Sequence, residues 1–404
     1  MALVCPYIIV PNLIPQPTWG GEYIAHLKGI SNSQNNQSAP LIDNLDKLGQ
    51  SYELFSDTKL STKCTTKDSS TIEIGNAKDP LQTQVHTSAD DHPFNINQLI
   101  TTNPQQVLGS KVLKHHGNKI DTLIKLTQAQ ENSYQLHVSQ KVGDWVAKPE
   151  SWYFLEPGLI TLGVKPNINW KDYQSACQQI DQEAHTISGL IVNGQLSLSA
   201  GTHRLSQFIK FHNPRNFVNR LSVPKNCAVN LSTGGVHHSW ESDSTTLPHG
   251  NIVYELQQNV FDPVSTIRAF DQGKIKPDGS VRDLNIEDYF NHIDHSSPAN
   301  IPQNHISTKK VLKHTSTYTI RQIFDTKNYR LQQLTFSKSI SNLYTTTSNS
   351  YHHLFVRSGN ISLFVNNHHW TLTSGFSIFI PASVGNYLIK PYQSKTATVL
   401  KTYL

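Results

Sequence analysis

Short segments rich in β-branched and aromatic residues recur along the whole chain, and they constrain the fold more than any other feature. Gly, Pro, Asn and Asp separate these segments, which is the pattern of strands joined by turns. The earlier segments are Tyr7–Val10, Ser51–Phe55, Thr71–Ile74, Trp152–Leu155, Leu159–Val164, Ala228–Leu231 and Asn251–Gln257. The later ones are more closely spaced: Tyr318–Phe324, Tyr329–Phe336, His353–Arg357, Asn360–Val365, Ser377–Ile380, Asn386–Ile389 and Thr396–Thr402. Many short strands at close spacing predict a mainly β protein built from antiparallel sandwiches or barrels.

Residues 168–215 break this pattern and predict an inserted helical subregion. In the segment "WKDYQSACQQIDQEAH", apolar or small residues follow the i, i+3, i+4 spacing of an amphipathic helix. These residues are Trp170, Tyr173, Ala176, Cys177 and Ile180. A polar excursion over residues 75–110 is expected to contain a second, short helix at Ile96–Ile100.

The length of the chain predicts more than one folding unit. Its 404 residues exceed the ~250–300 at which single hydrophobic cores stop growing, so two or three units are expected. Residues 291–310 contain two prolines, many polar residues and no periodicity, and are interpreted as a linker. The predicted division is therefore 1–290, containing the helical insertion, then the linker, then 311–404.

Charge, apolar runs and cysteines exclude several classes of protein. The formal net charge is +5 and the basic residues are dispersed, so nucleic acid is not a predicted partner. No apolar run approaches the ~20 residues that span a bilayer, so no membrane association is predicted. The segment "MALVCPYIIVP" is interpreted as a first strand and not as a signal peptide. The four scattered cysteines (Cys5, Cys64, Cys177 and Cys227) favour free thiols in a reducing cytoplasm over the alternative of two disulfides.

Two predicted strands carry polar residues on one face. In "NSYQLHVSQ", Ser133, Gln135 and His137 share a face because side chains alternate across a strand. In "KPESWYFLEPG", Lys148 and Glu150 share a face in the same way. An ordinary solvated strand face is the alternative interpretation of both patterns.

Two further segments complete the candidate chemistry. In "NLSTGGVHHSW" a Gly-Gly pair leads into His237, and "YELQQNVFDPVSTIRAFDQGK" holds Glu255, Arg268 and Lys274. Two His, one Glu and one Gln would form a four-donor set of charge −1, which leaves a divalent metal net positive and able to polarise an oxygen atom. The alternatives are a turn at His237 and a structural ion pair between Glu255 and Arg268. The metal interpretation requires all four segments to converge in space.

In their order and content these segments resemble type I mannose-6-phosphate isomerase, a metal-dependent family of the cupin superfamily. The similar segments are "PTWGGEYI", "LGQSYELF", "IDTLIKLTQAQENSYQLHV", "KPESWYFLEPG", "NFVNRLSVPKNCAVNLSTGGVHH" and "YELQQN…IRAFD". "GFSIFIPASVGNYLI" resembles the last cupin strand pair of the family. The resemblance implies two cupin-type antiparallel β-sandwich (jelly-roll) domains with the helical insertion in the first. The second domain is expected to lack a metal site, because Gly385 stands about where the first has His237.

The resemblance also implies a role for each matching residue. The implied metal ligands are Gln135, His137, Glu150 and His237, binding one Zn²⁺ per chain, with other divalent metals as alternatives. The implied catalytic residues are Arg268, Glu255 and Lys148, and the implied substrate-binding residues are Ser133 and Lys274. The implied activity is the interconversion of mannose 6-phosphate and fructose 6-phosphate through a cis-enediol, in the carbohydrate metabolism that leads to GDP-mannose. A cytoplasmic monomer or weak homodimer is expected.

The chain departs from the family pattern in three places; in one of them, Ser232-Thr233 replaces the Pro-Ala pair of its Pro-Ala-Gly-Thr-Val-His segment. Val138 or Ser139 replaces the proline that follows the Gln-x-His pair. The loop before Arg268 has about three extra residues, "VFDPVST", and Ile267 and Phe270 replace the tyrosines beside the arginine. Two other functions therefore stay open: a non-catalytic sugar-phosphate-binding cupin, and an isomerase of a different phosphosugar. A fused nucleotidyltransferase is excluded by the lack of a Gly-rich nucleotide loop.

Overall fold

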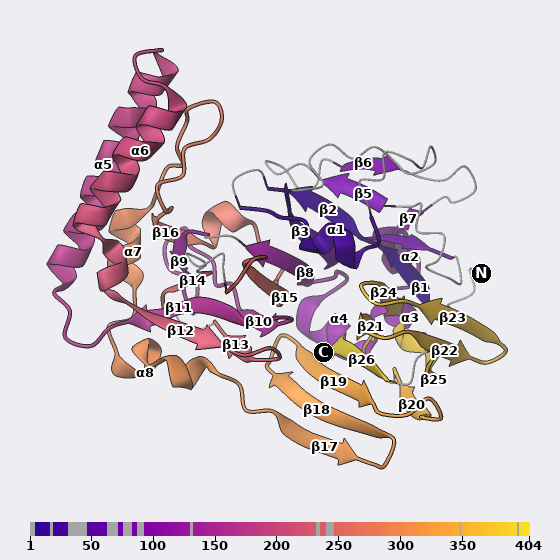
Figure 1. The fold of residues 1–404 in the computed structure, drawn as a ribbon. Coiled ribbons are helices and arrows are strands. Elements are labelled where there is room, and N and C mark those ends of the chain that lie inside the picture. Colours follow the sequence, from indigo (N-terminus) through magenta and orange to yellow (C-terminus); the bar gives the residue numbers. More distant parts are fainter. Residues whose placement is uncertain are drawn as a thin grey trace. The chain divides into compact units, whose positions relative to one another are not determined.

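The computed structural model confirms a mainly β chain with antiparallel sheets (Figure 1). It describes residues 5–16, 19–30, 47–62, 72–75, 83–86, 93–129, 132–231, 235–239, 246–347, 349–393 and 396–404. Cys64, Thr71 and residues 232–234, which the sequence interpretation used, lie outside these ranges. Cys5, Cys177 and Cys227 are free thiols. No helix in the described ranges combines the length and apolarity needed to cross a bilayer.

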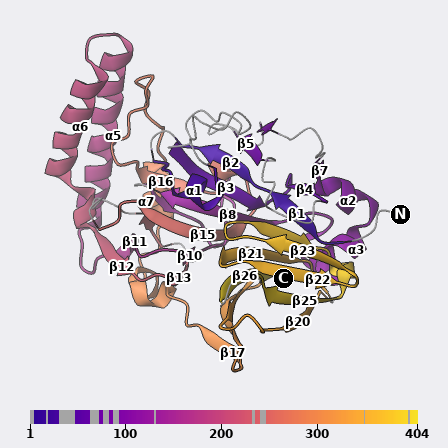
Figure 2. The ribbon, with the colours of Figure 1, turned by 45° about the vertical axis from the view of Figure 1, so that its right-hand side comes forward.

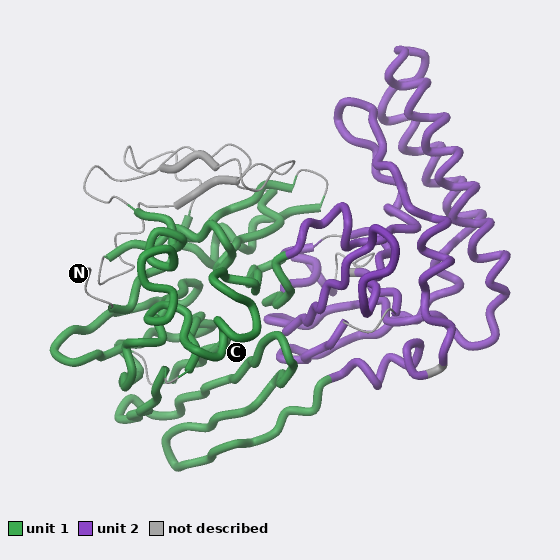
Figure 3. Tube along the Cα trace, turned by 180° about the vertical axis from the view of Figure 1, so that it is seen from behind, with its two compact units in different colours: residues 1–127, 254–259, 307–404 green, residues 128–253, 260–306 purple. Residues whose placement is uncertain are grey.

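The chain divides into two compact units (Figure 3). Unit 1 comprises residues 1–127, 254–259 and 307–404, and unit 2 comprises residues 128–253 and 260–306. Two of the four boundaries fall within strands β8 (Thr122–Ala129) and β15 (Asn251–Gln258), and the others follow Asn259 and Ile306. This division follows compactness in space; the division along the sequence into 1–290, 291–310 and 311–404 stays a prediction.

Unit 1 combines strands from the early and late parts of the chain. Its described residues form a nine-stranded sheet in the order β17-β18-β19-β26-β21-β24-β1-β4-β7. The strands are β1 (Tyr7–Val10), β4 (Lys59–Ser61), β7 (Phe94–Asn95), β17 (Lys310–His314), β18 (Tyr318–Asp325), β19 (Arg330–Phe336), β21 (His352–Ser358), β24 (Ser377–Ile380) and β26 (Ala397–Tyr403). Strand β1 therefore pairs with β24, with Tyr7 opposite Phe379.

Smaller sheets and short helices complete unit 1. Strands β20 (Leu343–Thr346), β25 (Asn386–Pro391), β22 (Ile361–Val365) and β23 (His368–Leu372) form a four-stranded sheet in that order. Strand β3 (Leu48–Leu54) pairs with β8 and with β2 (Asn12–Pro15), which continues to β5 (Ile72–Gly75) and β6 (Thr83–His86). The helices are α1 (Tyr23–Leu27), α2 (Ile96–Thr102), α3 (Pro104–Leu108), α4 (Ser110–His116) and the 3₁₀ turn η5 (Ala382–Val384). The short helix predicted at Ile96–Ile100 is confirmed by α2.

Unit 2 is built on a five-stranded antiparallel sheet in the order β12-β11-β14-β9-β16. Its strands are β12 (Val218–Val223), β11 (Gly158–Val164), β14 (His237–Ser239), β9 (Tyr134–Leu136) and β16 (Ile267–Phe270). Strand β10 (Glu150–Phe154) pairs antiparallel with β13 (Ala228–Asn230), and both belong to a different sheet from these five strands. Other elements are α7 (Ile286–His292), α8 (Ser297–Asn300) and the 3₁₀ turns η2 (Pro214–Asn216), η3 (Asp262–Val264) and η4 (Pro302–His305).

The predicted helical insertion is a pair of helices in unit 2. Helices α5 (Trp170–Val192) and α6 (Leu198–His212) lie side by side in both views (Figures 1 and 2). Asn169 caps α5 by accepting a hydrogen bond from the backbone N–H of Lys171, and Ser197 caps α6 through that of Ala200. The buried side of α5, which includes Tyr173 and Ile180, packs in one core with the sheet residues Tyr134 and Leu136. This core fixes the side of the sheet that faces the helices.

Candidate active site

Strand β9 divides the first motif between two faces, as side-chain alternation requires. Tyr134 and Leu136 are fully buried in the core that the sheet shares with the helices. Ser133, Gln135 and His137 alternate with them and belong to the opposite face. They are also buried, with exposed fractions of 3%, 9% and 1%. Ser133, Gln135 and His137 therefore lie on a buried face, and a solvated strand face is ruled out for them.

Gln135 lies between two other candidate residues in the sheet. It is the register partner of His237 on β14 and of Arg268 on β16. Directly opposed residues of antiparallel strands project from the same face, with Cβ atoms about 4.5–5.5 Å apart. The sheet thus brings Gln135 next to two residues that lie more than a hundred positions later in the sequence.

His137, Glu150 and His237 form a compact group, here called the His–Glu–His cluster. Among the described residues these three offer ligand atoms that all lie within 4.8 Å of one another. His137 Nε2 is 3.1 Å from Glu150 Oε2, and His237 Nε2 is 4.0 Å from Glu150 Oε1. Each side chain is about 1% exposed or less. Three of the four predicted ligands are therefore close enough to hold one ion. The fourth, Gln135, is the register partner of His237.

The two histidines have ring nitrogens without hydrogen bonds in this cluster. The Nδ1–H of His137 donates to the carbonyl oxygen of Ser265 at 2.7 Å, which fixes the ring so that Nε2 is the nitrogen that faces Glu150. Burial lowers the pKa of His237 to about 3, so this imidazole is neutral. Within the described part of the chain, His137 Nε2 and both ring nitrogens of His237 lack a hydrogen-bond partner. Buried ring nitrogens without a hydrogen-bond partner fit a divalent metal ion, which binds histidine through an unprotonated nitrogen.

Glu150 is held as an anion by its neighbours. The indole Nε1–H of Trp152 donates to its Oε1 at 2.6 Å, and Lys148 Nζ lies 3.3 Å from its Oε2. Burial by itself raises the pKa of the Glu150 carboxyl, but the charge of Lys148 and the contact with His137 outweigh it. The pKa therefore lies well below its usual range, and the carboxylate is available as a ligand.

Arg268 is fixed by three partners. Its Nη2 donates to Asp262 Oδ2 at 2.7 Å, its Nε to Ser133 Oγ at 3.2 Å and its Nη1 to the carbonyl oxygen of Thr266 at 3.3 Å. Asp262 also accepts from Thr266 Oγ1 at 2.7 Å and lies 3.5 Å from Lys148 Nζ. Burial raises the pKa of Asp262, but the charges of Arg268 and Lys148 and these hydrogen bonds lower it below its usual range. One carboxylate thus positions two cations beside the cluster.

Glu255 belongs to unit 1, unlike the residues above. Its Oε2 accepts from Thr127 Oγ1 at 2.8 Å, and its Oε1 lies 3.2 Å from Lys125 Nζ. All three side chains are buried. Glu255 is therefore a positioned, ion-paired carboxylate within unit 1, and its catalytic role stays a prediction from the sequence.

Lys274 influences the pKa of His238, the residue next to the predicted ligand His237. Burial is the main cause of the strongly lowered pKa of His238, and the charge of Lys274 lowers it further. His238 alternates with His237 on β14 and stacks edge-on against Tyr134 on the helix side of the sheet. The loop that carries Lys274 follows the same side, since a Cβ on Gly273 would meet Ile209 of α6 at 2.3 Å. A substrate contact by Lys274 stays a prediction.

Sequence reasoning missed Trp152 and Asp262. Trp152 is two positions after Glu150 on β10, so strand alternation could have placed it on the same face. Its ring also packs edge-on against His237, with ring centroids 5.7 Å apart. Asp262 lies in the longer loop before Arg268, where the sequence differs from the family pattern and gave no signal of an ion pair.

Comparisons with known proteins bear on the fold. No protein-family model matches the sequence, and no curated protein matches it. Among solved structures, the chain is similar to the mannose 6-phosphate isomerase of Bacillus subtilis, with 14% identity, a TM-score of 0.64 and coverage of 99% of this chain and 100% of that one. It is also similar to the enzyme of Salmonella typhimurium bound to substrate (F6P) and zinc, with 13% identity, a TM-score of 0.62 and 99% coverage of both chains. A zinc-bound mannose 6-phosphate isomerase matches with 13% identity, a TM-score of 0.63 and 99% coverage of both chains. Over nearly its whole length, this chain has the fold of the mannose-6-phosphate isomerases.

Proposed function

We propose that this protein is a metal-dependent sugar-phosphate isomerase that interconverts mannose 6-phosphate and fructose 6-phosphate. The observation that carries the proposal is the buried His–Glu–His cluster, with Gln135 opposite His237, in a fold shared with mannose-6-phosphate isomerases. Buried ring nitrogens without hydrogen-bond partners cost stability, and coordination of a metal ion would offset that cost. A cytoplasmic location, which the dispersed cysteines predict, is part of the same proposal.

The proposed ligands are Gln135, His137, Glu150 and His237, with one Zn²⁺ per chain. This mixed nitrogen and oxygen set also suits manganese, iron or cobalt. When bound, such a divalent ion would act as a Lewis acid on the sugar oxygens, because the ligand set neutralises only one of its two charges.

Lys148 and Arg268 supply the positive charge that the protein itself brings to the reaction. Moving a proton between the first two sugar carbons through a cis-enediol places negative charge on the neighbouring oxygens. Lys148 is buried beside Glu150, and Arg268 shares a sheet face with Gln135. Because Asp262 holds both cations in place, they need little reorganisation as that charge develops. Ser133, which accepts a hydrogen bond from Arg268 Nε, is the proposed substrate hydroxyl contact.

Glu255 remains the proposed base that removes the carbon-bound proton, and Lys274 the proposed phosphate contact. Both assignments come from the sequence. A general base must be ionised and held in a defined orientation to work. The bond from Thr127 and the ion pair with Lys125 meet these two conditions for Glu255 within unit 1.

The decisive experiment combines metal analysis with a coupled assay for fructose 6-phosphate. Purified protein, stripped with chelator and reloaded with Zn²⁺, should bind one ion per chain and convert mannose 6-phosphate. His237→Ala should lose both properties, because it removes one of the four ligands. His203→Ala is the matched control, since His203 is an exposed histidine on α6 and should keep both.

Three results would count against the proposal. Failure of the wild type to bind any divalent metal would remove its basis. Metal and phosphosugar binding without turnover would favour the non-catalytic sugar-phosphate-binding cupin. Turnover of another aldose phosphate in preference to mannose 6-phosphate would favour an isomerase with a different substrate.

A further inference from the structure

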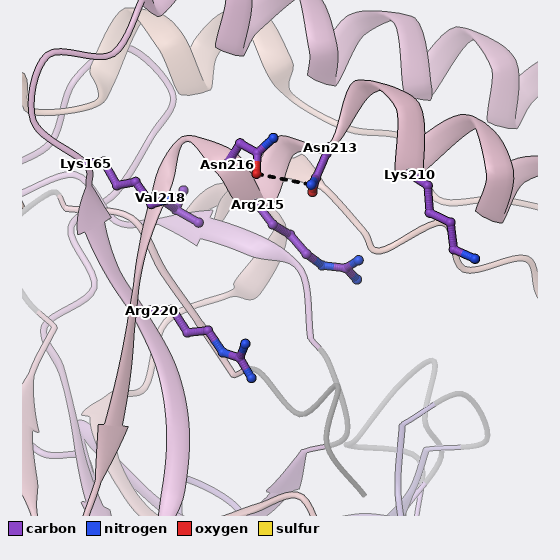
Figure 4. Close-up of a pocket in the computed structure, with 7 residues that line it drawn as sticks. All are labelled: Lys165, Lys210, Asn213, Arg215, Asn216, Val218 and Arg220. Atoms are coloured by element: carbon purple, nitrogen blue, oxygen red, sulfur yellow. Dashed lines mark hydrogen bonds between the residues drawn. The ribbon is translucent and has the colours of Figure 1, made fainter.

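Unit 1 buries a lysine that has no anionic partner in the described part of the chain. Lys401, on β26, is 9% exposed, and burial lowers its pKa to about 8. Its ammonium group makes no hydrogen bond and no ion pair with the described residues. Lysines at the surface need no partner because water solvates them, as at Lys165 and Lys210, which line a hollow in unit 2 (Figure 4). A buried ammonium group loses that solvation, so Lys401 requires another explanation.

Lys401 lies on the interior face of the nine-stranded sheet. Its register partners are Gln332 on β19 and Leu354 on β21, and directly opposed residues share a face. Leu354 belongs to the core that this sheet shares with the four-stranded sheet. His352 precedes Leu354 by two positions and so shares its face, where His352 Nδ1 lies 2.6 Å from the hydroxyl oxygen of Tyr387 on β25. Lys401 therefore projects toward the interior of this two-sheet core.

A second donor without an acceptor lies beside the ammonium group. Lys401 Nζ is 4.9 Å from the ring centroid of Tyr403, two positions later on the same strand. Gln322 Nε2 donates to the carbonyl oxygen of Leu331 at 3.2 Å, so Gln322 Oε1 accepts from Gln332 Nε2 at 3.1 Å. The same Gln332 Nε2 donates to the Tyr403 hydroxyl oxygen at 2.8 Å. The hydrogen of the Tyr403 hydroxyl is therefore directed elsewhere, and it has no acceptor among the described residues.

The acidic residue near this end of the sheet is already paired. Asp325 Oδ1 lies 2.7 Å from Arg330 Nε, and Arg330 is the register partner of both Asp325 and Tyr403. Neither charge contributes to the lowered pKa of Lys401, which burial alone explains. The ring of Tyr403 attracts the ammonium group, but a cation–π contact offsets only part of the cost of burying a cation. The described chain thus leaves one cation and one hydroxyl donor without an acceptor.

We infer that Lys401 and Tyr403 bind the carboxylate group of a small monoanionic molecule. A carboxylate has two acceptor oxygens, one for the ammonium group and one for the hydroxyl, and its single charge matches the single cation. The pKa of His352 is lowered by burial and then by the charge of Lys401, so the neighbouring ring is neutral and adds no second cation. A phosphate dianion would therefore leave an excess of buried negative charge. The inference is independent of the proposed isomerase activity.

Acetate is the probe, and the midpoint of thermal unfolding of the full chain is the measurement. Sodium acetate replaces sodium chloride at constant ionic strength and neutral pH, where Lys401 is protonated. A ligand that binds only the folded state raises the midpoint by mass action. The wild type should show a saturable rise, whereas Lys401→Met should show only the general effect of the salt. Tyr403→Phe removes the hydroxyl and should weaken the fitted affinity roughly ten-fold.

The matched control is Lys390→Met. Lys390 is a half-buried lysine of unit 1 that also lies over an aromatic ring, with Nζ 5.1 Å from the ring centroid of Phe364. The control removes the same charge and should keep the wild-type response to acetate. An equal loss in Lys390→Met and Lys401→Met would show general charge attraction only and would overturn the inference, as would a wild type with no saturable rise.

Arg268→Gln separates this site from the candidate active site. A saturable response that survives Lys401→Met and disappears in Arg268→Gln would assign acetate to the candidate active site and overturn the inference. A response that survives Arg268→Gln and disappears in Lys401→Met would support it. Inorganic phosphate tests the ligand class: the part of its effect that depends on Lys401 should be smaller than that of acetate, and a larger one would overturn the assignment to a carboxylate.

Discussion

Trp152→Phe tests whether the hydrogen bond to Glu150 orients a metal ligand. The substitution removes the indole N–H, which donates to Glu150 Oε1 at 2.6 Å, and keeps an aromatic ring beside His237. A hydrogen bond to a charged group contributes about 1.5–3 kcal/mol. At about 1.4 kcal/mol for each factor of ten, a loss of that size weakens Zn²⁺ binding by roughly 10–100-fold. The same range is typical when a group that orients a metal ligand is removed.

The measurement is a Zn²⁺ titration of stripped protein against a competing fluorescent chelator. Denaturant unfolding without metal gives the part of the effect that belongs to packing, because phenylalanine leaves space where the indole was. Trp170→Phe is the matched control, since Trp170 is partly buried on α5 and stacks on His295. It should lower stability without changing Zn²⁺ affinity. If Trp152→Phe keeps its Zn²⁺ affinity within two-fold of the wild type, the orienting role of this hydrogen bond is refuted.

Three further predictions concern the ion pair, a helix cap and a buried lysine. Asp262→Asn should lower kcat at least ten-fold at unchanged metal content, because Arg268 and Lys148 lose their shared carboxylate; steady-state kinetics and elemental analysis check this. Ser197→Ala should lower the free energy of unfolding by about 1 kcal/mol in denaturant titrations, since it removes the cap of α6, and isomerase activity should not change. Burial lowers the pKa of Lys401 from 10.5 to about 8, so between these values the unfolded chain binds more protons. The free energy of unfolding should therefore rise by up to about 3 kcal/mol from pH 8 to 10.5, relative to Lys401→Met in the same titrations.

Local sequence patterns were sufficient where the deciding interactions are themselves local. The helical spacing of apolar residues such as Tyr173 and Ile180 predicted α5, because an amphipathic helix buries every third or fourth residue. The alternation around Leu136 predicted which side chains of "NSYQLHVSQ" face away from the core. The grouping of His137 with His237 came from the family resemblance, because no local rule states which strands become neighbours.

Features that depend on distant pairing were not predictable from the residues. The partners of Arg268 include Asp262, which lies in a loop whose length differs from the family pattern. The pairing of β1 with β24 joins residues at opposite ends of the sequence, and hydrophobic alternation is the same for any partner strand. The compact units therefore interleave along the chain in a way that composition and periodicity do not specify.

The pairing of β1 also sets an order of events during synthesis. Tyr7 meets its partner Phe379 only after roughly 370 further residues have been made, which takes about 20–70 s at cellular elongation rates. Strand β4 can cover one edge of β1 early, with Ile8 opposite Ser61, but the other edge waits as an open strand. The two segments of unit 2 span residues 128–306, so unit 2 has all its residues available well before β24 emerges. During synthesis, all residues of unit 2 are thus present while one edge of β1 is still without its partner strand.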